Sequence, residues 1–444
     1  MVTRTPFQVD MALLEPVHEM MQTGIRVDEE KKTEFHQLYH ERWQKAQEQI
    51  DRVAGGPLNV GSPKQMKDFL FNELKLPPRT KGGKLTSDED ALRSLMAVCN
   101  DKANTLKTNA ARYRWMQGAI VCRLALNIRS ARKRLSSYID IDHDTDGRIR
   151  STISVGGTET GRFSHSKTLW GTGVNLATIP RELRSMYIAD PGYVLAEFDL
   201  NRGESWVYAH LSEDPELLRI HEGGFDFHAE TASAISSAFG APLTVEYITA
   251  HRGGDAYKIR YLGKKVNHAS AYRMGPYRGA QVVNAEADDT GITITVGQFR
   301  EAQARWREKY FMMPSWWAEI ERDLGTDRTL KTPYGRQLQF HGHWGEGLFK
   351  EATAYVPQST SVDYLNRGLI RVYENFQKKD AWGLKILSQT HDSILVTLKE
   401  DTISEAAPAI IEMLTDQLTI KGRTFSIPVE GEYGPSWGEM DAIT

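Results

Sequence analysis

Hydrophobic positions recur with helical spacing along most of the first third of the chain. This spacing predicts helices over residues 8–53 and, in one or two pieces, over 102–137. Between them, Ser62 and Pro63 stand in the order expected for a helix N-cap and its first helical position. We therefore expect the first 140 residues to be helical.

The pattern changes after residue 140. Short stretches of alternating apolar residues and turn formers predict strands, and the clearest of them is GYVLAEFDL at 192–200. Because side chains alternate along a strand, this one places Tyr193, Leu195, Glu197 and Asp199 on one face.

Helical patterns return further along, and a mixed region follows them. Residues 213–350 predict mainly helices, and 346–378 continue them. A β-hairpin is predicted at 384–398, where two apolar runs flank SQTHDS, and a helix at 403–420. The order of helical and mixed regions predicts an α+β fold whose sheet-containing core is interrupted by a helical insertion.

The overall composition is that of an ordinary globular protein. The 444 residues suffice for two or three domains or one large subdivided domain, and 25% of them are charged. The 55 basic and 58 acidic residues give a net charge of −3, which does not by itself indicate a nucleic-acid binder. However, nine basic residues and no acidic ones lie between Lys102 and Arg134. This basic strip is either a solvated helix face or a surface that neutralises phosphates.

Cysteine content and hydropathy indicate the cellular compartment in which the protein works. Cys99 and Cys122 are too few for a disulfide framework and have no metal-ligand spacing to histidines, so we expect a reducing compartment and no zinc site. No stretch reaches the roughly 18 apolar residues of a membrane span. The sequence therefore predicts a cytoplasmic protein with no membrane partner.

Two aspartates fall at strand ends, where a lone aspartate is most often a cap or an ion-pair partner. Asp392 lies at the tip of the predicted hairpin beside His391, and Asp199 lies near the end of the strand at 192–200. If the two meet in space, they can hold two divalent metal ions about 3.5–4 Å apart, as phosphoryl transfer requires. The sequence spacing alone leaves both interpretations open.

The segment RYLGKKVNHASAY carries a polar stripe. Arg260, Lys264, His268 and Tyr272 recur every four residues and so share one broad face of a helix. An exposed basic face is the ordinary explanation. Two cations one turn apart can also bind a triphosphate, and an aromatic ring further along can stack on a base.

Three segments, EFDLNRGES, RYLGKKVNHASAY and QTHDSILV, resemble in order the three polymerase motifs of family A DNA polymerases, the bacterial DNA polymerase I group. TETGRFSHS with NLATIP, FDFHAETA, TPYGRQL and PQSTSVD resemble further blocks of that family, also in order. GSPKQMKDFLFNEL with KLTSDEDAL is similar to the family's thumb region. The resemblance covers nearly the whole chain.

The resemblance implies an α+β right-hand polymerase fold with a helical thumb at 1–140 and helical fingers at 213–339, including a motif B helix at about 257–273. The palm, with an antiparallel sheet, would comprise 141–212 and 340–444. The implied activity is that of a DNA-directed DNA polymerase. This nucleotidyltransferase adds dNMP to a primer 3′-hydroxyl and releases pyrophosphate, in replication or repair.

The resemblance also implies two Mg²⁺ ions, for which Mn²⁺ can substitute. Their ligands would be Asp199, Asp392 and the backbone carbonyl of Leu200. Lys264 would act with the aspartates in catalysis by protonating the leaving pyrophosphate.

Further roles follow from the matching positions. Glu204 resembles the steric gate that rejects ribonucleotides, with Tyr272 as its partner. The residues implied to bind the nucleotide are Arg260, Lys264, His228, Glu204, His268 and Tyr272. Those implied to bind primer–template DNA are Arg162, Asn175, Gln358, His391 and Arg336.

The chain departs from the family pattern at several of these motifs. Ser393 stands where the family usually has Glu, so one carboxylate is missing from the metal neighbourhood. His268 replaces the usual Phe or Tyr, and Ala354 replaces a frequent Asn. These departures suggest a divergent, phage-like or mobile-element member, which would work in a host cytoplasm.

We expect no 3′–5′ proofreading domain, because the thumb-like region begins almost at Met1; a polymerase-only enzyme and a fragment both fit. We expect a monomer that binds primer–template DNA and dNTPs, and leave a separate exonuclease or processivity factor open. Two alternatives are a ribonucleotide-tolerant polymerase, against which Glu204 argues, and a catalytically inactive primer–template-binding protein, against which Asp199 and Asp392 argue.

Overall fold

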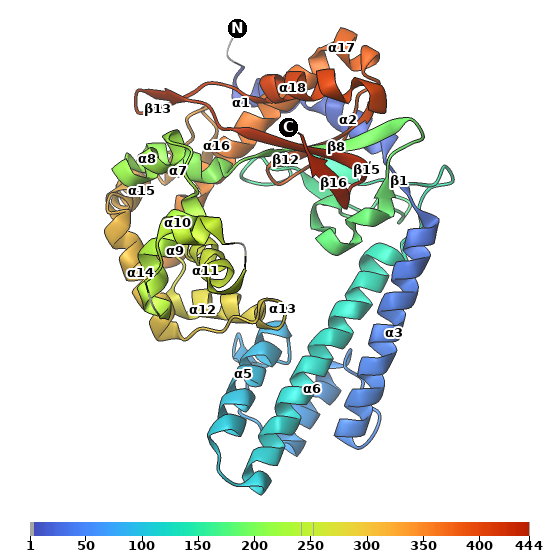
Figure 1. Ribbon diagram of the computed structural model, residues 1–444, viewed down its shortest axis with the longest axis vertical. Coiled ribbons are helices and arrows are strands. Elements are labelled where there is room, and N and C mark those ends of the chain that lie inside the picture. The colour runs from blue at the N-terminus through green and yellow to red at the C-terminus, as the bar shows by residue number, and fades with distance from the viewer. Residues whose placement is uncertain (1–3, 241, 252, 444) are drawn as a thin grey trace.

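An eight-stranded antiparallel sheet lies in the upper part of the molecule in Figure 1. The computed structural model describes residues 4–240, 242–251 and 253–443. The strands of the sheet are β1 (Ile25–Val27), β4 (Arg148–Ile149), β7 (Tyr187–Ile188), β8 (Tyr193–Leu200), β11 (Lys385–Thr390), β12 (Ser393–Lys399), β15 (Val429–Ser436) and β16 (Glu439–Ala442). Their order is β11-β12-β8-β15-β7-β1-β4, with β16 paired to β15, so the sheet joins segments from both ends of the chain.

Both faces of the central strands are covered by protein. On β8, Val194, Ala196 and Phe198 belong to one hydrophobic core, whereas Leu195 on the opposite face belongs to another. Strand β12 follows the same division, which explains why its sequence is a nearly unbroken apolar run. The sheet is therefore anchored on both sides, and its register is strongly specified.

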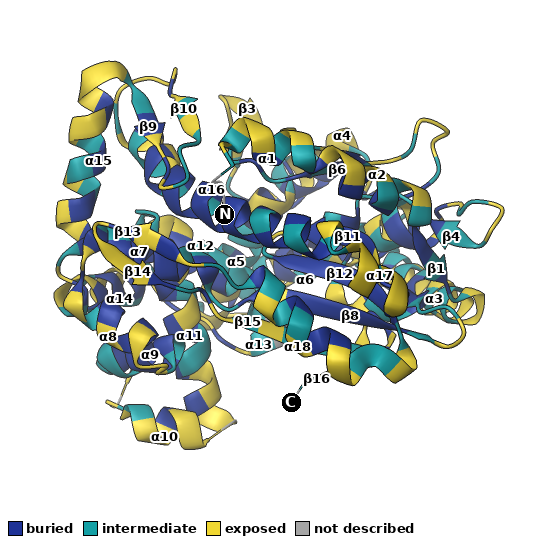
Figure 2. Ribbon diagram, turned by 90° about the horizontal axis from the view of Figure 1, so that it is seen from above, coloured by how far each residue is buried: buried dark blue, intermediate teal, exposed yellow. Residues whose placement is uncertain are grey.

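Helices from both ends of the chain pack around this sheet. The longest of them, α16 (Glu346–Glu374), is buried along much of its length, as Figure 2 shows. The others are α1 (Pro6–Ala12), α2 (Leu14–Thr23), α17 (Phe376–Ala381), the short η6 (Glu400–Thr402) and α18 (Ile403–Leu414). Helix α2 packs on β11, and α18 packs on α16.

A first helical arm extends from one side of the sheet (Figure 1). Its elements are α3 (Glu29–Ala54), α4 (Pro63–Lys67), η1 (Asp68–Glu73), the hairpin β2 (Thr80–Lys81) and β3 (Lys84–Leu85), α5 (Glu89–Thr105), α6 (Asn109–Arg134) and η2 (Leu135–Ile139). Asp28 caps the start of α3 by accepting a hydrogen bond from the Lys31 N–H at 3.0 Å, and left-handed Gly55 ends the helix. Ser62 and Pro63 begin α4 as predicted. The arm has a hydrophobic core of its own.

A second helical arm lies on the other side (Figure 1). Its helices are α7 (Gly203–Ser212), α8 (Pro215–Glu222), α9 (Phe227–Ile235), η5 (Ser236–Phe239), α10 (Val245–Ala250), α11 (Gly254–Ala271), α12 (Pro276–Ala285), α13 (Ala287–Thr290), α14 (Val296–Lys309) and α15 (Met313–Asp327), followed by the hairpin β9 (Thr329–Lys331) and β10 (Gln337–Gln339). Fully buried Trp306 and Tyr310 lie in the core of this arm.

Small elements connect these parts. They are β5 (Thr152–Ser154) paired with β6 (Ser164–Ser166), β13 (Leu418–Ile420) paired with β14 (Arg423–Phe425), and the 3₁₀ turns η3 (Leu176–Thr178) and η4 (Arg181–Met186).

The two arms touch at their ends. The Arg93 guanidinium donates a hydrogen bond to the Ala285 carbonyl at 2.6 Å, and Arg278 lies 3.3 Å from the Asp90 carboxylate. A cavity of about 970 Å³ lies between α5 and α12–α14.

Two secondary-structure predictions need correction. The first 140 residues are not wholly helical, because β1 joins the central sheet and β2 pairs with β3. The helix predicted over 403–420 ends at Leu414, where the hydroxyl of buried Tyr364 bonds both backbone groups of Asp416 at 2.7 Å and draws this residue out of the helix. The strand at 192–200 and the hairpin at 384–398 are confirmed.

A buried ion-pair group joins α1, α16 and the β9–β10 hairpin. Arg336, whose side chain is 13% exposed, contacts Asp363, which is fully buried, and Asp10, both at 2.7 Å. We expect Arg336→Ala to lower the free energy of unfolding by about 3–5 kcal/mol, because it leaves the Asp363 charge buried without its partner.

Urea unfolding measures this effect, and Arg278→Ala is the matched control. Its ion pair with Asp90 is more than half exposed on both sides, so its removal is expected to change stability by less than about 1 kcal/mol. Equal effects of the two substitutions would contradict the assignment of Arg336 as a structural anchor.

Candidate active site

The two aspartates singled out in the sequence lie on adjacent strands. Strand β12 pairs with β8 so that Ser393 lies opposite Asp199, which places Asp392 beside the end of β8. The Leu200 N–H donates to the Asp392 carbonyl at 3.0 Å and fixes the turn against β8. His391 occupies the left-handed region at φ 55°, which lets the chain reverse within two residues.

The acidic surroundings perturb both carboxyl groups. Burial, followed by the charges of Asp392, Glu197 and Glu430, raises the pKa of Asp199 well above its usual range. Since the Asp199 side chain still reaches solvent, we attribute more of this shift to its acidic neighbours than to desolvation. Burial is the main cause that raises the pKa of Asp392.

These carboxylates suit a hard divalent cation. Neither one forms an ion pair with a Lys, Arg or His side chain of the described residues, so their charge is uncompensated there. Oxygen ligands are those that Mg²⁺ and Mn²⁺ prefer, and a cation would relieve the repulsion between the two groups. Within residues 4–240, 242–251 and 253–443, no group of three or more His, Cys, Asp or Glu side chains is arranged to hold a metal ion.

Glu204, at the start of α7, is held by two of the predicted site residues. The Arg162 guanidinium donates to one Glu204 oxygen at 2.7 Å, and the Tyr272 hydroxyl donates to the other. Tyr272 lies just after the last residue of α11, and burial together with the Glu204 charge raises the pKa of its phenol well above 10. The structure thus brings together an acid, a cation and an aromatic ring from three separate segments.

The predicted cationic group forms around the middle of α11 and the start of α9. Arg260 forms an ion pair with Asp226 at 2.9 Å, and Asp226 also caps α9 by accepting from the backbone N–H of His228. Lys264 has no carboxylate within 4 Å among the residues that the structure describes. Asp226 was missed in the sequence, although an Asp before FHAETA has the pattern of a helix N-cap.

His268 completes the stripe predicted on this helix. Its ring contacts Tyr272 edge to face at 5.4 Å between centroids. It also lines a small cavity together with Lys264 and Met274. The stripe ends with Tyr272, because α11 stops at Ala271.

The other predicted DNA contacts occupy varied places. Asn175 caps η3 by accepting from the Ala177 N–H at 3.0 Å, and the His391 ring lies 3.1 Å from the Ala177 carbonyl. Gln358 is half-buried on α16. The Arg336 guanidinium donates hydrogen bonds to the carboxylates of Asp10 and Asp363.

The basic strip, which runs from the end of α5 through α6, has two kinds of member. Arg112 donates to the Ala103 carbonyl at 2.8 Å, and Arg129 donates to the carbonyls of Val60 and Ser87. The exposed members of the strip are Lys102, Lys107, Arg114, Arg123, Arg132 and Lys133.

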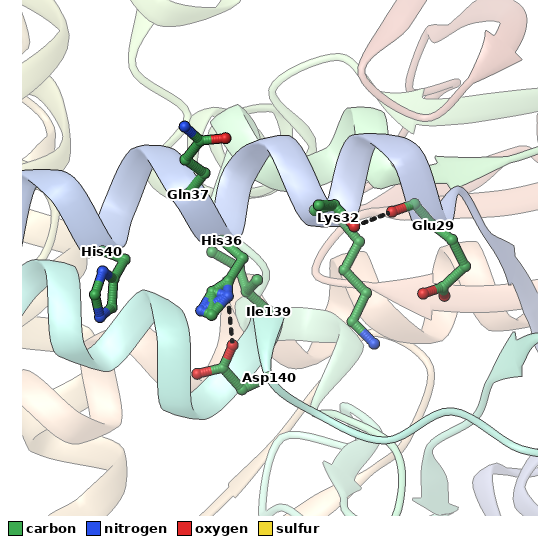
Figure 3. Close-up of a pocket in the computed structure, with 8 residues that line it drawn as sticks. Glu29, Lys32, His36, Gln37, His40, Ile139 and Asp140 are labelled. Carbon is green, nitrogen blue, oxygen red and sulfur yellow. Dashed lines mark hydrogen bonds and ion pairs between the residues drawn. The ribbon is translucent and has the colours of Figure 1, made fainter.

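A separate cavity of about 430 Å³ lies between α3 and the end of η2 (Figure 3). In it, His36 lies 3.9 Å from the Asp140 carboxylate and 5.7 Å from the ring of His40, measured between centroids. Among the described helices, none has both the length and the hydropathy that a membrane span requires.

The chain belongs to DNA polymerase family A, whose family model matches residues 29–439. It is 28% identical over 457 residues to DNA polymerase I of Chloroflexus aurantiacus and 26% identical over 451 residues to the thermostable DNA polymerase I of Thermus filiformis. These matches cover 98% and 96% of this chain but 43% and 47% of those proteins, so the chain spans less than half the length of these relatives.

A solved structure shares the fold. The POL domain of Pol1 from M. smegmatis, in complex with DNA primer-template and dNTP, matches with a TM-score of 0.75 at 22% identity, over 97% of this chain and 70% of that one. The predicted α+β class and right-hand polymerase fold are confirmed, as is the resemblance to family A.

A buried histidine, His221, and a half-buried one, His228, lie near the cationic group and predict a loss of stability in acid. Burial, with nearby cations, lowers the pKa of His221 to about 3 and that of His228 to about 4, from an ordinary value of 6.5. The unfolded chain therefore binds more protons than the folded one in this window, so stability is expected to fall as pH decreases from about 6.5 towards 4.

Urea midpoints measured across this pH range test the expectation. His228→Asn is expected to flatten the dependence, whereas His343→Asn, on an exposed side chain, is expected to leave it unchanged. A midpoint that stays constant from pH 6.5 to 4 would contradict the burial of neutral imidazoles.

Proposed function

We propose that this chain is a template-directed DNA polymerase that adds dNMP to the 3′-hydroxyl of a primer by two-metal-ion phosphoryl transfer. The observation that carries the proposal is the meeting of Asp199 and Asp392 on paired strands in a member of family A. The proposed partners are primer–template DNA and dNTPs, bound by a monomer.

The proposed division into parts follows the three structural regions. The sheet and its helices, approximately 141–212 and 340–444, act as the palm, with β1 and its preceding helices added to it. The first arm is the thumb, and the second arm without α7, approximately 213–339, is the fingers. In this arrangement the fingers contribute α11 and the palm contributes the carboxylate pair to the same proposed active site.

Asp199 and Asp392, with the Leu200 carbonyl, are the proposed metal ligands. Two bound Mg²⁺ ions, or Mn²⁺ in their place, would lower the pKa of the primer 3′-hydroxyl and neutralise part of the phosphate charge. The uncompensated negative charge of the pair supports this assignment, because it favours a dication over a monovalent one.

Arg260, Lys264 and His228 are proposed to bind the triphosphate. Lys264 can bind a phosphate directly, whereas Arg260 must first break its ion pair with Asp226. A neutral His228 can donate one hydrogen bond without adding charge. We propose that α11 rotates towards the palm when a correct nucleotide binds, and that Lys264 then donates a proton to the leaving pyrophosphate.

Glu204 and Tyr272 are proposed to discriminate deoxyribose from ribose in the incoming nucleotide, and His268 lies beside them. The carboxylate that Tyr272 and Arg162 hold in place excludes a 2′-hydroxyl by contact. The residues proposed to contact the primer–template are Arg162, Asn175, Gln358, His391 and Arg336. Arg336 can do so only with its outer edge, because Asp10 and Asp363 occupy its donors.

Primer extension tests the metal assignment. Asp392→Ala is expected to reduce dNTP addition in Mg²⁺ by more than about a thousandfold (about 4 kcal/mol), since it removes half of the carboxylate pair. Affinity for the primer–template is expected to stay within a few fold of wild type.

Asp401→Ala is the control, because this exposed aspartate follows the same strand away from the site. Extension at near wild-type rate by Asp392→Ala would refute the assignment. Tight primer–template binding without extension by the wild-type chain would indicate a non-catalytic binding protein instead.

The sugar-selecting role of Glu204 is tested by nucleotide preference. Glu204→Ala is expected to raise the ratio of rNTP to dNTP incorporation by at least about tenfold, because it removes the group that contacts the 2′ position. Tyr272→Phe, which keeps the ring but frees Glu204, is expected to raise the ratio less. An unchanged ratio in both variants would exclude a steric gate at this position.

A further inference from the structure

Glu197 is a buried carboxylate two residues before Asp199 on the same face of β8. Its side chain is 7% exposed, and a charge at such a position is unfavourable unless it is paired and hydrogen-bonded. Three donors meet it: the Ser393 hydroxyl at 2.7 Å, the Trp437 indole N–H at 3.0 Å and the Arg184 guanidinium at 3.3 Å. A carboxylate with this many partners is held in one orientation.

Ser393 connects this carboxylate to the turn that carries Asp392. Its Oγ lies 2.7 Å from Glu197 and 3.2 Å from the Thr390 carbonyl, which precedes the turn. Ser393 also lies opposite Asp199 in the strand pairing, so this residue joins the two sides of the turn to β8. Movement of Glu197 would therefore be transmitted to both aspartates.

The other two partners of Glu197 come from distant segments. The Arg184 guanidinium stacks over the Trp437 ring at 4.4 Å, and the Trp437 backbone N–H donates to the Tyr187 carbonyl at 2.9 Å. These contacts tie Glu197 to η4, β7 and the turn between β15 and β16. The carboxylate thus stands between a rigid support on one side and the Asp392 turn on the other.

We propose that Glu197 is a positioning residue that holds Asp199 and Asp392 in their relative geometry through Ser393. It supplies, from the neighbouring strand, the carboxylate that the family resemblance leads us to expect at position 393. A glutamate at 393 would place a second carboxylate against Glu197 in a buried region, whereas serine donates a hydrogen bond to it. Residues 197 and 393 are therefore interdependent, an inference that rests on the proposed function of the aspartate pair.

A carboxylate exchange between the strands tests this interdependence. Primer-extension kinetics are measured for Ser393→Glu, Glu197→Ser and the double variant Glu197→Ser/Ser393→Glu. Each single variant is expected to lose at least about tenfold in kcat, with KM for dNTP within about twofold of wild type, because the aspartates rather than the nucleotide site are displaced. The double variant, which again has one carboxylate and one hydroxyl, is expected to recover to within about threefold of wild type.

Thermal unfolding and Mn²⁺ binding accompany the kinetics. Glu197→Gln, which keeps an acceptor for Ser393 but lacks the charge, is the conservative variant and is expected to remain folded with an intermediate kcat. Mn²⁺ affinity, measured by calorimetry, is expected to fall in the single variants and return in the double one, independently of turnover. A purely structural role would lower thermal stability without this pattern in kcat and Mn²⁺ affinity.

The outcomes separate this inference from the proposed function. If wild type extends primers and the double variant is as slow as the product of the two single losses, the positioning role of Glu197 is overturned. If wild type neither extends primers nor binds Mn²⁺ in a manner that requires Asp199, the proposed function itself fails.

Discussion

The antiparallel pairing of β8 with β12 is the interaction on which the site depends. It places Ser393 opposite Asp199 and thereby brings Asp392, at the turn before β12, to the same end of the sheet. Both strands are buried on both faces, so a shift of one residue would move apolar side chains out of two cores at once. The packing of the sheet therefore sets the distance between the two carboxylates. The favourable free energy of hydrophobic burial elsewhere in the sheet offsets the unfavourable free energy of their repulsion.

Local pattern predicted the strand and the hairpin that carry the two aspartates, but not that these elements pair. The alternation in 192–200 and the two apolar runs around His391 and Asp392 correctly predict a strand and a hairpin. No local property relates residues that are 392 − 199 = 193 positions apart, and only the family resemblance brought these strands together. The end of α18 was missed for a related reason, because the tyrosine hydroxyl that competes for the backbone comes from α16.

Partner acids in the cationic part of the site were equally hidden. The spacing of Arg260 and Lys264 indicated one helix face, yet it could not reveal that Asp226 engages only the first of them. Arg162 and Glu204, from separate segments, neutralise each other in the same way. Arg162 and Arg260 are thus compensated by protein acids, whereas no Lys, Arg or His side chain of the described residues forms an ion pair with Asp199 or Asp392. Under the proposed function, the aspartates would bind cations without first breaking an ion pair, whereas Arg260 would have to leave Asp226 to bind a phosphate.

The basic strip on α6 shows how a helix divides a run of like charge. Arginines on its inner side extend their guanidinium groups to backbone carbonyls, as Arg129 does to Val60 and Ser87, and so hold the arm together. Side chains on its outer side, such as Arg123 and Lys133, remain in solvent. Neither interpretation of the strip included this structural role, which arises because the helical period turns part of the charge towards the inside of the arm. Any phosphate neutralisation along this arm falls to the exposed members, and because they contact solvent it must weaken as salt increases.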